Sequence, residues 1–381
     1  MSISLLNLSV YLFFLLFISK PSAKLGASFY YFNVDIDDKL SNDSLSDKFN
    51  PSCIYLRYFD VNWSAVKNQP TPTKELNTEY LNRSELGIFK NEYIPVIYIV
   101  GSTFDNLVEV HIPKLVGRVL AKSDRITLSI EEGFIEVERS KFYDTLYNQG
   151  LDYEVINTKL DSIRQVISGS RVGTVKEFQI DCDWTAKNRD KYFKFLTILK
   201  DSLQKRNMKL SVTIRLYPYK YSKKMGVPPV DKGVLMCYNL GQIQNSNTKN
   251  SVFDVKELDK YLKVKSYPLP LDVALPIFGW YVWHTGKECR GIIHLSDKTR
   301  GLENNPNFTK LGNELMSKVD TVIENKYIRV GDQLRMEIPK KKELIEAKKL
   351  INNKVKFNKF IYFNWEPTSL YHYEEVFNTS N

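Results

Sequence analysis

The chain has 381 residues, 43% of them hydrophobic, which is enough to bury a sizeable core and excludes a disordered or fibrous chain. The net charge of +10 could suit an anionic partner, but the basic residues are scattered through helix-like segments and only residues 340–342 form a tight run. This distribution is typical of a solvated surface, so we expect no nucleic-acid partner.

An apolar run from Leu5 to Ile18 opens the chain, and small residues follow it in PSAKLGAS. The run is short for a transmembrane helix and has the pattern of a secretory signal peptide, which we place at residues 1–23, with Ala27 as an alternative cleavage position. We therefore expect a secreted or periplasmic protein without stable membrane insertion. An uncleaved membrane anchor is the alternative, because no lysine or arginine precedes the run.

The spacing of the cysteines and the absence of nucleotide-binding glycine motifs argue against cofactor chemistry. The 4 cysteines show neither CxxC nor metal-ligand spacing. The chain also has no phosphate-binding loop, dinucleotide glycine motif or nucleophile elbow. We expect no disulfide framework, no metal and no cofactor.

After the leader, short β-prone apolar segments alternate with helix-like segments, which is the pattern of a parallel sheet covered by helices. Strands are expected at residues 27–34, 53–61, 93–100, 177–184, 209–217, 233–240, 271–280 and 359–366. Eight strands favour a closed α/β barrel of the (β/α)8 TIM type over an open doubly wound sheet. We expect residues 24–381 to form this single domain.

Helices are expected at residues 106–121, 142–148, 151–168, 187–206 and 255–263. The clearest is 187–206, where apolar residues recur at three- and four-residue spacing and can pack on the sheet as one stripe. These residues are Tyr192, Phe195, Leu196, Leu199 and Leu203.

Two insertions interrupt the alternation. The first lies between the third and fourth strands and contains a strand-like segment at 127–138. The second is an inserted subdomain at about residues 285–355, in which we expect a helix at 311–319 and a β-hairpin at 327–338. Added strands at this point of a barrel would lie over its mouth.

The fourth strand ends in two carboxylates, Asp181 and Asp183, in the segment KEFQIDCDWT. Residues two apart on a strand share a face, so both acids point to one side while Cys182 points to the other. Like charges on one face raise each other's pKa, so such a pair indicates solvent, a cation, a sugar hydroxyl or proton chemistry. Two loop-anchoring aspartates before a helix are the alternative.

Catalysis in barrels occurs at the carboxyl ends of the strands, so the last inward residues of each strand are the candidate site residues. Aromatic rings mixed with carboxylates, an arginine and amides are typical of a saccharide pocket, because sugar rings stack on flat apolar faces and hydroxyls take hydrogen bonds. The candidates are Asp60, Asp181, Asp183, Arg215, Tyr217, Tyr238, Asn239, Trp280, Trp365 and Glu366.

The DCDW segment resembles the signature strand of family 18 glycoside hydrolases, the chitinase-like barrels, whose pattern is DxxDxDWE. Asp181 and Asp183 match its second and third acidic positions, and Met236 and Tyr238 match the family's MxYD motif in the sixth strand. Trp365 is similar to the tryptophan that ends the family's eighth strand. The chain also resembles a group of uncharacterised secreted bacterial proteins with a DCDWT strand, which carries no established activity.

This sequence departs from the family pattern at three positions. Phe178 replaces the first aspartate, Asn239 replaces the aspartate of the sixth strand, and Thr185 occupies the position of the catalytic glutamic acid. In the family, that acid protonates the glycosidic oxygen while the substrate's acetamido group attacks. A threonine cannot donate a proton on that path.

Three hypotheses follow. The first is a hydrolase with a relocated acid, in which Asp183 is the nucleophile or orients the substrate, and Asp60, Asp231 or Glu366 supplies the second carboxyl group. The second is a non-catalytic glycan-binding barrel, in which Trp280, Trp365 and Tyr217 stack on sugars. The third is a divalent-metal site at Asp60, Asp181 and Asp183, although no matching loop motif accompanies them.

Overall fold

The computed structural model describes residues 25–32, 48–49, 51–78, 92–160, 175–245, 248–263, 266–296 and 299–378. The expected signal peptide at residues 1–23 lies outside these residues, as does the second half of the expected helix at 151–168. In the part of the chain that the structure describes, no helix combines the length and the apolar character needed to cross a membrane.

Eight parallel strands close into a barrel, because β1 pairs with β16 on one side and with β2 on the other. The strands are β1 (Leu25–Tyr31), β2 (Pro51–Ser64), β4 (Glu92–Ile99), β5 (Glu177–Asp181), β6 (Lys209–Arg215), β7 (Lys232–Met236), β8 (Leu271–Pro276) and β16 (Phe360–Phe363). A further strand, β3 (Gln69–Thr73), pairs antiparallel with β2. The expected TIM barrel is confirmed, with a strand at each predicted position.

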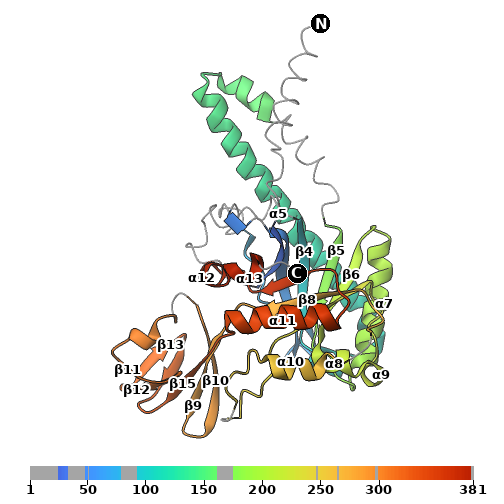
Figure 1. The fold of residues 1–381 in the computed structure, drawn as a ribbon. Helices are drawn as coiled ribbons and strands as arrows, with labels where there is room; N and C mark the ends of the chain where they lie inside the picture. The colour runs from blue at the N-terminus through green and yellow to red at the C-terminus, as the bar shows by residue number, and fades with distance from the viewer. Residues whose placement is uncertain are drawn as a thin grey trace.

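Helices cover the outside of the barrel (Figure 1). They are α4 (Ser102–Asn106), η3 (Glu109–His111), α5 (Ile112–Asn148), α7 (Arg189–Gln204), α8 (Leu216–Lys220), α9 (Ser222–Met225), α10 (Val255–Tyr261), α11 (Lys341–Lys354), α12 (Pro367–His372) and α13 (Glu374–Asn378). The short helix η4 (Leu302–Asn304) lies in the insertion after β8. The predicted apolar stripe of α7 is buried along its length. Residues 153–160 are also helical.

The strand expected at 127–138 is wrong, because this segment lies inside the 37-residue helix α5. The same helix joins the two shorter helices expected at 106–121 and 142–148. Ile126 and Ile130 are buried and four residues apart, so the helical period prevailed over the apparent alternation of the segment.

The insertion after β8 forms a separate antiparallel sheet beside the barrel (Figure 1). Its order is β10-β9-β15-β12-β11, with β9 (Trp280–Thr285), β10 (Glu288–His294), β11 (Phe308–Leu311), β12 (Glu314–Ser317) and β15 (Gln333–Glu337). Strands β13 (Thr321–Ile323) and β14 (Lys326–Ile328) pair with each other.

Two expectations for this insertion are wrong. Residues 311–319 are not a helix, because β11 and β12 form a hairpin in which Gly312 adopts a positive φ of 67° at the turn. Residues 327–338 are not a hairpin either. The strands on both sides of Gly331 pair with different partners, β14 with β13 and β15 with β9 and β12.

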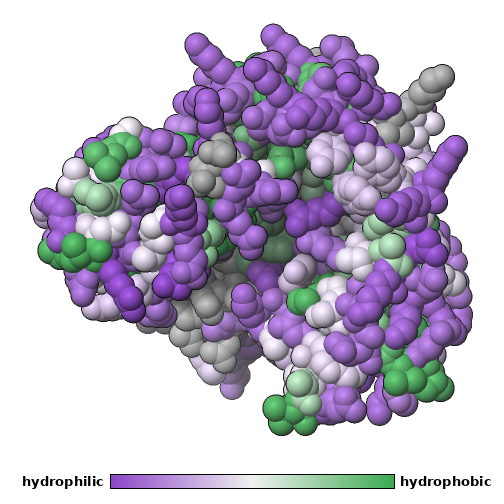
Figure 2. All heavy atoms as spheres, turned by 90° about the horizontal axis from the view of Figure 1, so that it is seen from below, coloured by the Kyte–Doolittle hydropathy of each residue, from purple (hydrophilic) through white to green (hydrophobic). Residues whose placement is uncertain are grey.

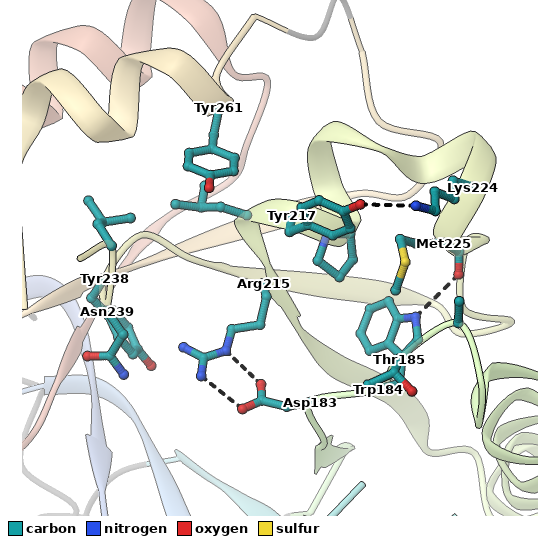
Figure 3. A pocket seen from close by; sticks show the side chains of 14 residues that line it. Asp183, Trp184, Thr185, Arg215, Tyr217, Lys224, Met225, Tyr238, Asn239 and Tyr261 are labelled. Atoms are coloured by element: carbon teal, nitrogen blue, oxygen red, sulfur yellow. Dashed lines mark hydrogen bonds and ion pairs between the residues drawn. The ribbon is translucent and has the colours of Figure 1, made fainter. Parts of the chain in front are cut away.

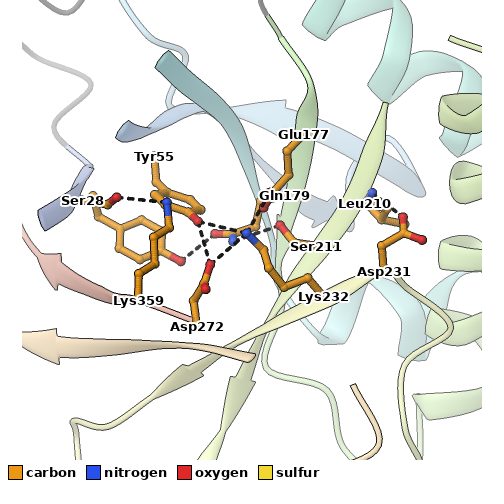
Figure 4. A network of polar contacts seen from close by, with 11 residues as sticks. Ser28, Tyr55, Glu177, Gln179, Leu210, Ser211, Asp231, Lys232, Asp272 and Lys359 are labelled. Atoms are coloured by element: carbon orange, nitrogen blue, oxygen red, sulfur yellow. Dashed lines mark hydrogen bonds and ion pairs between the residues drawn. The ribbon is translucent and has the colours of Figure 1, made fainter. Parts of the chain in front are cut away.

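The barrel interior at the amino ends of the strands holds a polar network (Figure 4). Lys232 Nζ lies 2.8 Å from carboxylate oxygens of both Glu177 and Asp272. Burial lowers the pKa of Lys232, but the attraction of Glu177 and Asp272 outweighs it, so the pKa is raised and the ammonium stays charged. Deeper in the barrel, Tyr30 donates to Gln179 over 2.7 Å. This network fills the end of the barrel opposite to the mouth.

We expect Lys232→Met to destabilise the protein by about 3–5 kcal/mol, because it leaves the buried Asp272 and the partly buried Glu177 without their shared counter-ion. The exposed Lys209 at the start of β6 is the matched control, and Lys209→Met is expected to change the free energy of unfolding by less than about 0.5 kcal/mol. Urea unfolding of both variants measures this, and equal stabilities would contradict the role given to Lys232.

Candidate functional site

Asp181 and Asp183 share one face at the end of β5, as predicted, and each contacts the neighbouring strand β6. Thr213 Oγ1 donates to Asp181 Oδ1 over 2.6 Å. Arg215 donates from Nε and Nη2 to the two oxygens of Asp183, over 2.7 and 2.9 Å (Figure 3). Both contacts follow the parallel register that places Gln179 beside Ser211. Each acid is therefore held by a partner of its own on β6.

Asp181 is only 6% exposed, whereas the side chain of Asp183 is 43% exposed. Burial raises the pKa of Asp181 to about 6, an effect that the hydrogen bond from Thr213 opposes and the charge of Asp183 reinforces. Burial lowers the pKa of Arg215, but the Asp183 carboxylate outweighs this and raises it overall. The mouth thus has one buried acid that can be neutral in mild acid and one partly exposed arginine–aspartate pair.

A second arginine–aspartate pair lies on β2. Arg57 donates to both oxygens of Asp60, over 2.8 and 2.5 Å. Arg57 and Asp60 are three residues apart, so their side chains would lie on opposite faces of a regular strand. The pairing of β2 with β4, however, shifts in register between Arg57 and Phe59. Tyr58 and Phe59 both contact α5 on the outside, through Thr127 and Lys122, as expected for a β-bulge. The bulge therefore brings Asp60 to the inner face.

Aromatic rings form the floor between these polar groups. Phe363 lies 4.9 Å from Phe32, 5.6 Å from Tyr238 and 5.3 Å from Phe278, measured between ring centroids. The Arg57 guanidinium lies 5.1 Å from the centroid of Phe32. Burial raises the pKa of Tyr238, so its hydroxyl remains a neutral donor.

The carboxyl ends of the strands face the viewer in Figure 2, because α8 and α9, which follow β6, lie at the bottom of Figure 1. A hollow lies near the centre of this face, between the inserted sheet on the left and the helices on the right. Hydrophobic atoms lie in its depth, and hydrophilic residues surround it.

A pocket of about 520 Å³ lies on the side of this mouth formed by β5, β6 and β7 (Figure 3). Its lining combines one ion pair, several tyrosines and amide or hydroxyl groups. The lining residues are Asp183, Trp184, Thr185, Ala186, Arg215, Leu216, Tyr217, Pro218, Lys224, Met225, Tyr238, Asn239, Leu240 and Tyr261. Five predicted site residues therefore meet here: Asp183, Arg215, Tyr217, Tyr238 and Asn239.

Thr185, at the position of the family acid, is exposed on the pocket wall. Its backbone N–H donates to Asn188 Oδ1 over 2.8 Å, and Asn188 in turn donates to the carbonyl oxygen of Gly101 over 3.0 Å. The loop after β5 is thus held in place, and the group it presents to the pocket is a hydroxyl.

Other predicted site residues do not join this pocket. Trp280 begins β9, and its indole donates to the buried Glu337 over 3.1 Å. Trp365 packs outside the barrel, edge-on to Phe29 at 5.0 Å. Glu366 caps α12 by accepting from Ser369 N, and it also pairs with Arg300.

Asp231 lies at the amino end of the barrel, where it accepts from Leu210 N over 2.9 Å and pairs with Lys200 (Figure 4). It is therefore too far along the barrel to supply a second carboxyl group to Asp183.

The three-carboxylate metal hypothesis finds no support in the geometry. Asp60, Asp181 and Asp183 are held by Arg57, Thr213 and Arg215 respectively. Among the described residues, no three His, Cys, Asp or Glu side chains gather as metal ligands.

Sequence reasoning missed Arg57, Phe278, Phe363 and Tyr98. The pKa of Tyr98 is raised to about 12 by burial and then by Asp181 and Asp183, which places it at the same mouth. A signal existed, since Arg57 follows Tyr55 by two residues, and Phe278 and Phe363 each precede the predicted tryptophan by two. The predicted alternation of inward and outward residues along these strands is right, but β8 ends at Pro276 and β16 at Phe363, earlier than the predicted ends at residues 280 and 366.

We expect the pKa of Asp181 to appear in the pH dependence of stability. Because its pKa in the folded state is raised above 3.8, its favourable contribution is complete below about pH 4 and is lost as the pH rises through about 6. Relative to Asp181→Asn, the wild type should therefore lose about 2–3 kcal/mol between pH 4 and pH 7. Urea unfolding of both proteins across this range measures it. A difference that does not change with pH would show that Asp181 titrates normally.

No model of a known protein family matches the chain, and no curated protein matches its sequence. Solved structures do match. A chitinase from Chromobacterium violaceum aligns with a TM-score of 0.51 and 10% identity, over 93% of this chain and 99% of that one. The spore cortex-lytic enzyme SleL of Bacillus cereus gives 0.48 and 14%, over 93% and 74%. A Group IV chitinase from Ostrinia furnacalis gives 0.44 and 10%, over 93% and 97%.

At such identities the likeness is one of fold. The chain has the closed barrel of the Chromobacterium chitinase over nearly its whole length, and the distant resemblance to family 18 is confirmed at that level.

Proposed function

We propose that the protein binds a poly- or oligosaccharide in the pocket at the ends of β5, β6 and β7 and does not hydrolyse it. The observation that carries this proposal is the pocket lining. Among the described residues that form this lining, Asp183 is the one with a carboxylate, and Arg215 engages both of its oxygens. An export signal at residues 1–23 would bring such a barrel to saccharides outside the cell.

Hydrolysis by the usual routes needs two carboxyl groups on opposite sides of the scissile bond. Each carboxylate that the first hypothesis named is committed elsewhere: Asp60 to Arg57, Glu366 to Arg300 and Asp231 to Lys200. Thr185 supplies no acid. The geometry thus favours the binding hypothesis over the hydrolase.

The pocket offers what a sugar needs for binding. Tyr217 is 44% exposed and presents a ring face at the rim, with Tyr261 on another wall (Figure 3). The Asp183–Arg215 pair and Asn239 offer donors and acceptors for hydroxyl groups. The volume is within the range of small-molecule sites. The chitinase name of the similar structure also supports a saccharide as the ligand class.

One observation favours hydrolysis as a second function. The pKa of Asp181, raised to about 6 by burial, would let this residue carry a proton in mild acid. Asp181 is buried beneath the pocket and bound to Thr213, however, and it is not part of the lining. Proton donation to a bound sugar would therefore require Asp181 to leave Thr213.

We expect purified protein to bind oligosaccharides without releasing product at pH 5 or pH 7. Calorimetry over a panel of oligosaccharides and chromatography of the recovered ligand measure the two properties. Product that disappears in Asp183→Asn would contradict the proposal and support the hydrolase.

Tyr217→Ala is expected to weaken binding about tenfold, because a stacking ring is lost. Tyr147→Ala is the matched control: Tyr147 is 62% exposed near the end of α5, which projects away from the mouth (Figure 1). Equal loss in both variants would place the ligand elsewhere.

A further inference from the structure

The wall of the pocket formed by α8 and α9 carries lysines and tyrosines without acids. Residues 215–226 read RLYPYKYSKKMG and contain Lys220, Lys223 and Lys224 but neither Asp nor Glu. The basic residues elsewhere are scattered over the surface, whereas this local excess of positive charge lies beside the candidate site.

Two of these lysines contact the rings of the pocket. Lys224 lines the pocket, and its Nζ lies 3.4 Å from the hydroxyl of Tyr217 (Figure 3). Lys220 Nζ lies 5.4 Å from the ring centroid of Tyr261 and 5.3 Å from that of Tyr221. The ammonium group of Lys224 is therefore part of the pocket lining, and that of Lys220 lies over Tyr261, one of the rings of the lining.

The acids near this wall are already paired. Asp183 is bound to Arg215, and on the adjacent helices Asp190 pairs with Arg189 and Glu257 with Lys260. Asp254 caps α10, and Asp259 pairs with Lys354. Within the described part of the chain, no ion pair involves Lys220, Lys223 or Lys224. Once Asp183 and Arg215 cancel, the pocket lining keeps the positive charge of Lys224.

We propose that the saccharide bound here is anionic and carries a carboxylate or sulfate group that Lys224 and Lys220 bind at the rim. This inference rests on the proposed function and specifies its ligand class. A neutral sugar would gain little from either ammonium, whereas an anionic group would gain a charge-assisted hydrogen bond and faster association.

The test uses three tetramers with one backbone: N-acetylglucosamine tetramer, its 6-O-sulfated form and its 6-carboxyl form. We expect the wild type to bind one or both anionic forms at least tenfold more tightly than the neutral form at low salt, with the advantage shrinking as salt is added. The sulfated and carboxylated arms distinguish the two sources of charge. Equal affinity for all three tetramers, or an advantage that is insensitive to salt, would overturn the inference while leaving saccharide binding intact.

Lys220→Gln with Lys224→Gln should reduce the ratio of anionic to neutral affinity about five- to tenfold. The matched control is Lys205→Gln with Lys209→Gln, because both lysines are exposed at the opposite end of the barrel. An equal reduction in the control would show a general charge effect and overturn the inference. Failure of all three tetramers to bind would instead overturn the proposed function itself.

Discussion

The ion pair between Asp183 and Arg215 determines what the mouth of this barrel can do. It joins the ends of two adjacent strands, and it engages both oxygens of the one carboxylate that lines the pocket among the described residues. A carboxylate that an arginine engages through both oxygens is held in one orientation, and its remaining lone pairs can accept hydrogen bonds from hydroxyl groups. The pocket therefore provides charge and orientation without an acid.

Buried polar groups find their partners in different ways at the two ends of the barrel. At the amino end, the ammonium group of Lys232 pairs with the carboxylates of both Glu177 and Asp272. At the carboxyl end, the arginines of two strands each bind a nearby aspartate, and a floor of phenylalanines fills the space between them. The pocket opens to one side of this floor, where Tyr217 and Tyr261 stand at the rim.

The strands and the site acids could be predicted because they depend on local periodicity. Contacts between β5 and β6 repeat at constant spacing, from Gln179 with Ser211 to Asp183 with Arg215, so one register places all of them. The positions of Trp280 and Trp365 could not be predicted in the same way, because they depend on where strands end. At Gly279 a Cβ atom would lie 2.6 Å from the carbonyl oxygen of Glu337 at the end of β15, and Trp280 begins β9 of the inserted sheet.

Two further features depend on contacts that are distant in sequence. The bulge after Arg57 reverses the side of the strand on which Asp60 lies, and nothing in the local sequence marks it. The strand pairing of the inserted sheet likewise depends on β9, which inserts beside β15 rather than allowing β14 and β15 to form a hairpin. The turn residues could be recognised in the sequence, but the strand with which each strand pairs could not.

A crystal structure of the protein soaked with an oligosaccharide tests the central claim most directly. The account predicts an intact sugar chain against Tyr217, with hydroxyl groups bound to the Asp183–Arg215 pair and no second carboxyl group across a glycosidic oxygen from Asp183. A cleaved product in the pocket, or a carboxyl group facing Asp183 across the glycosidic bond, would contradict it.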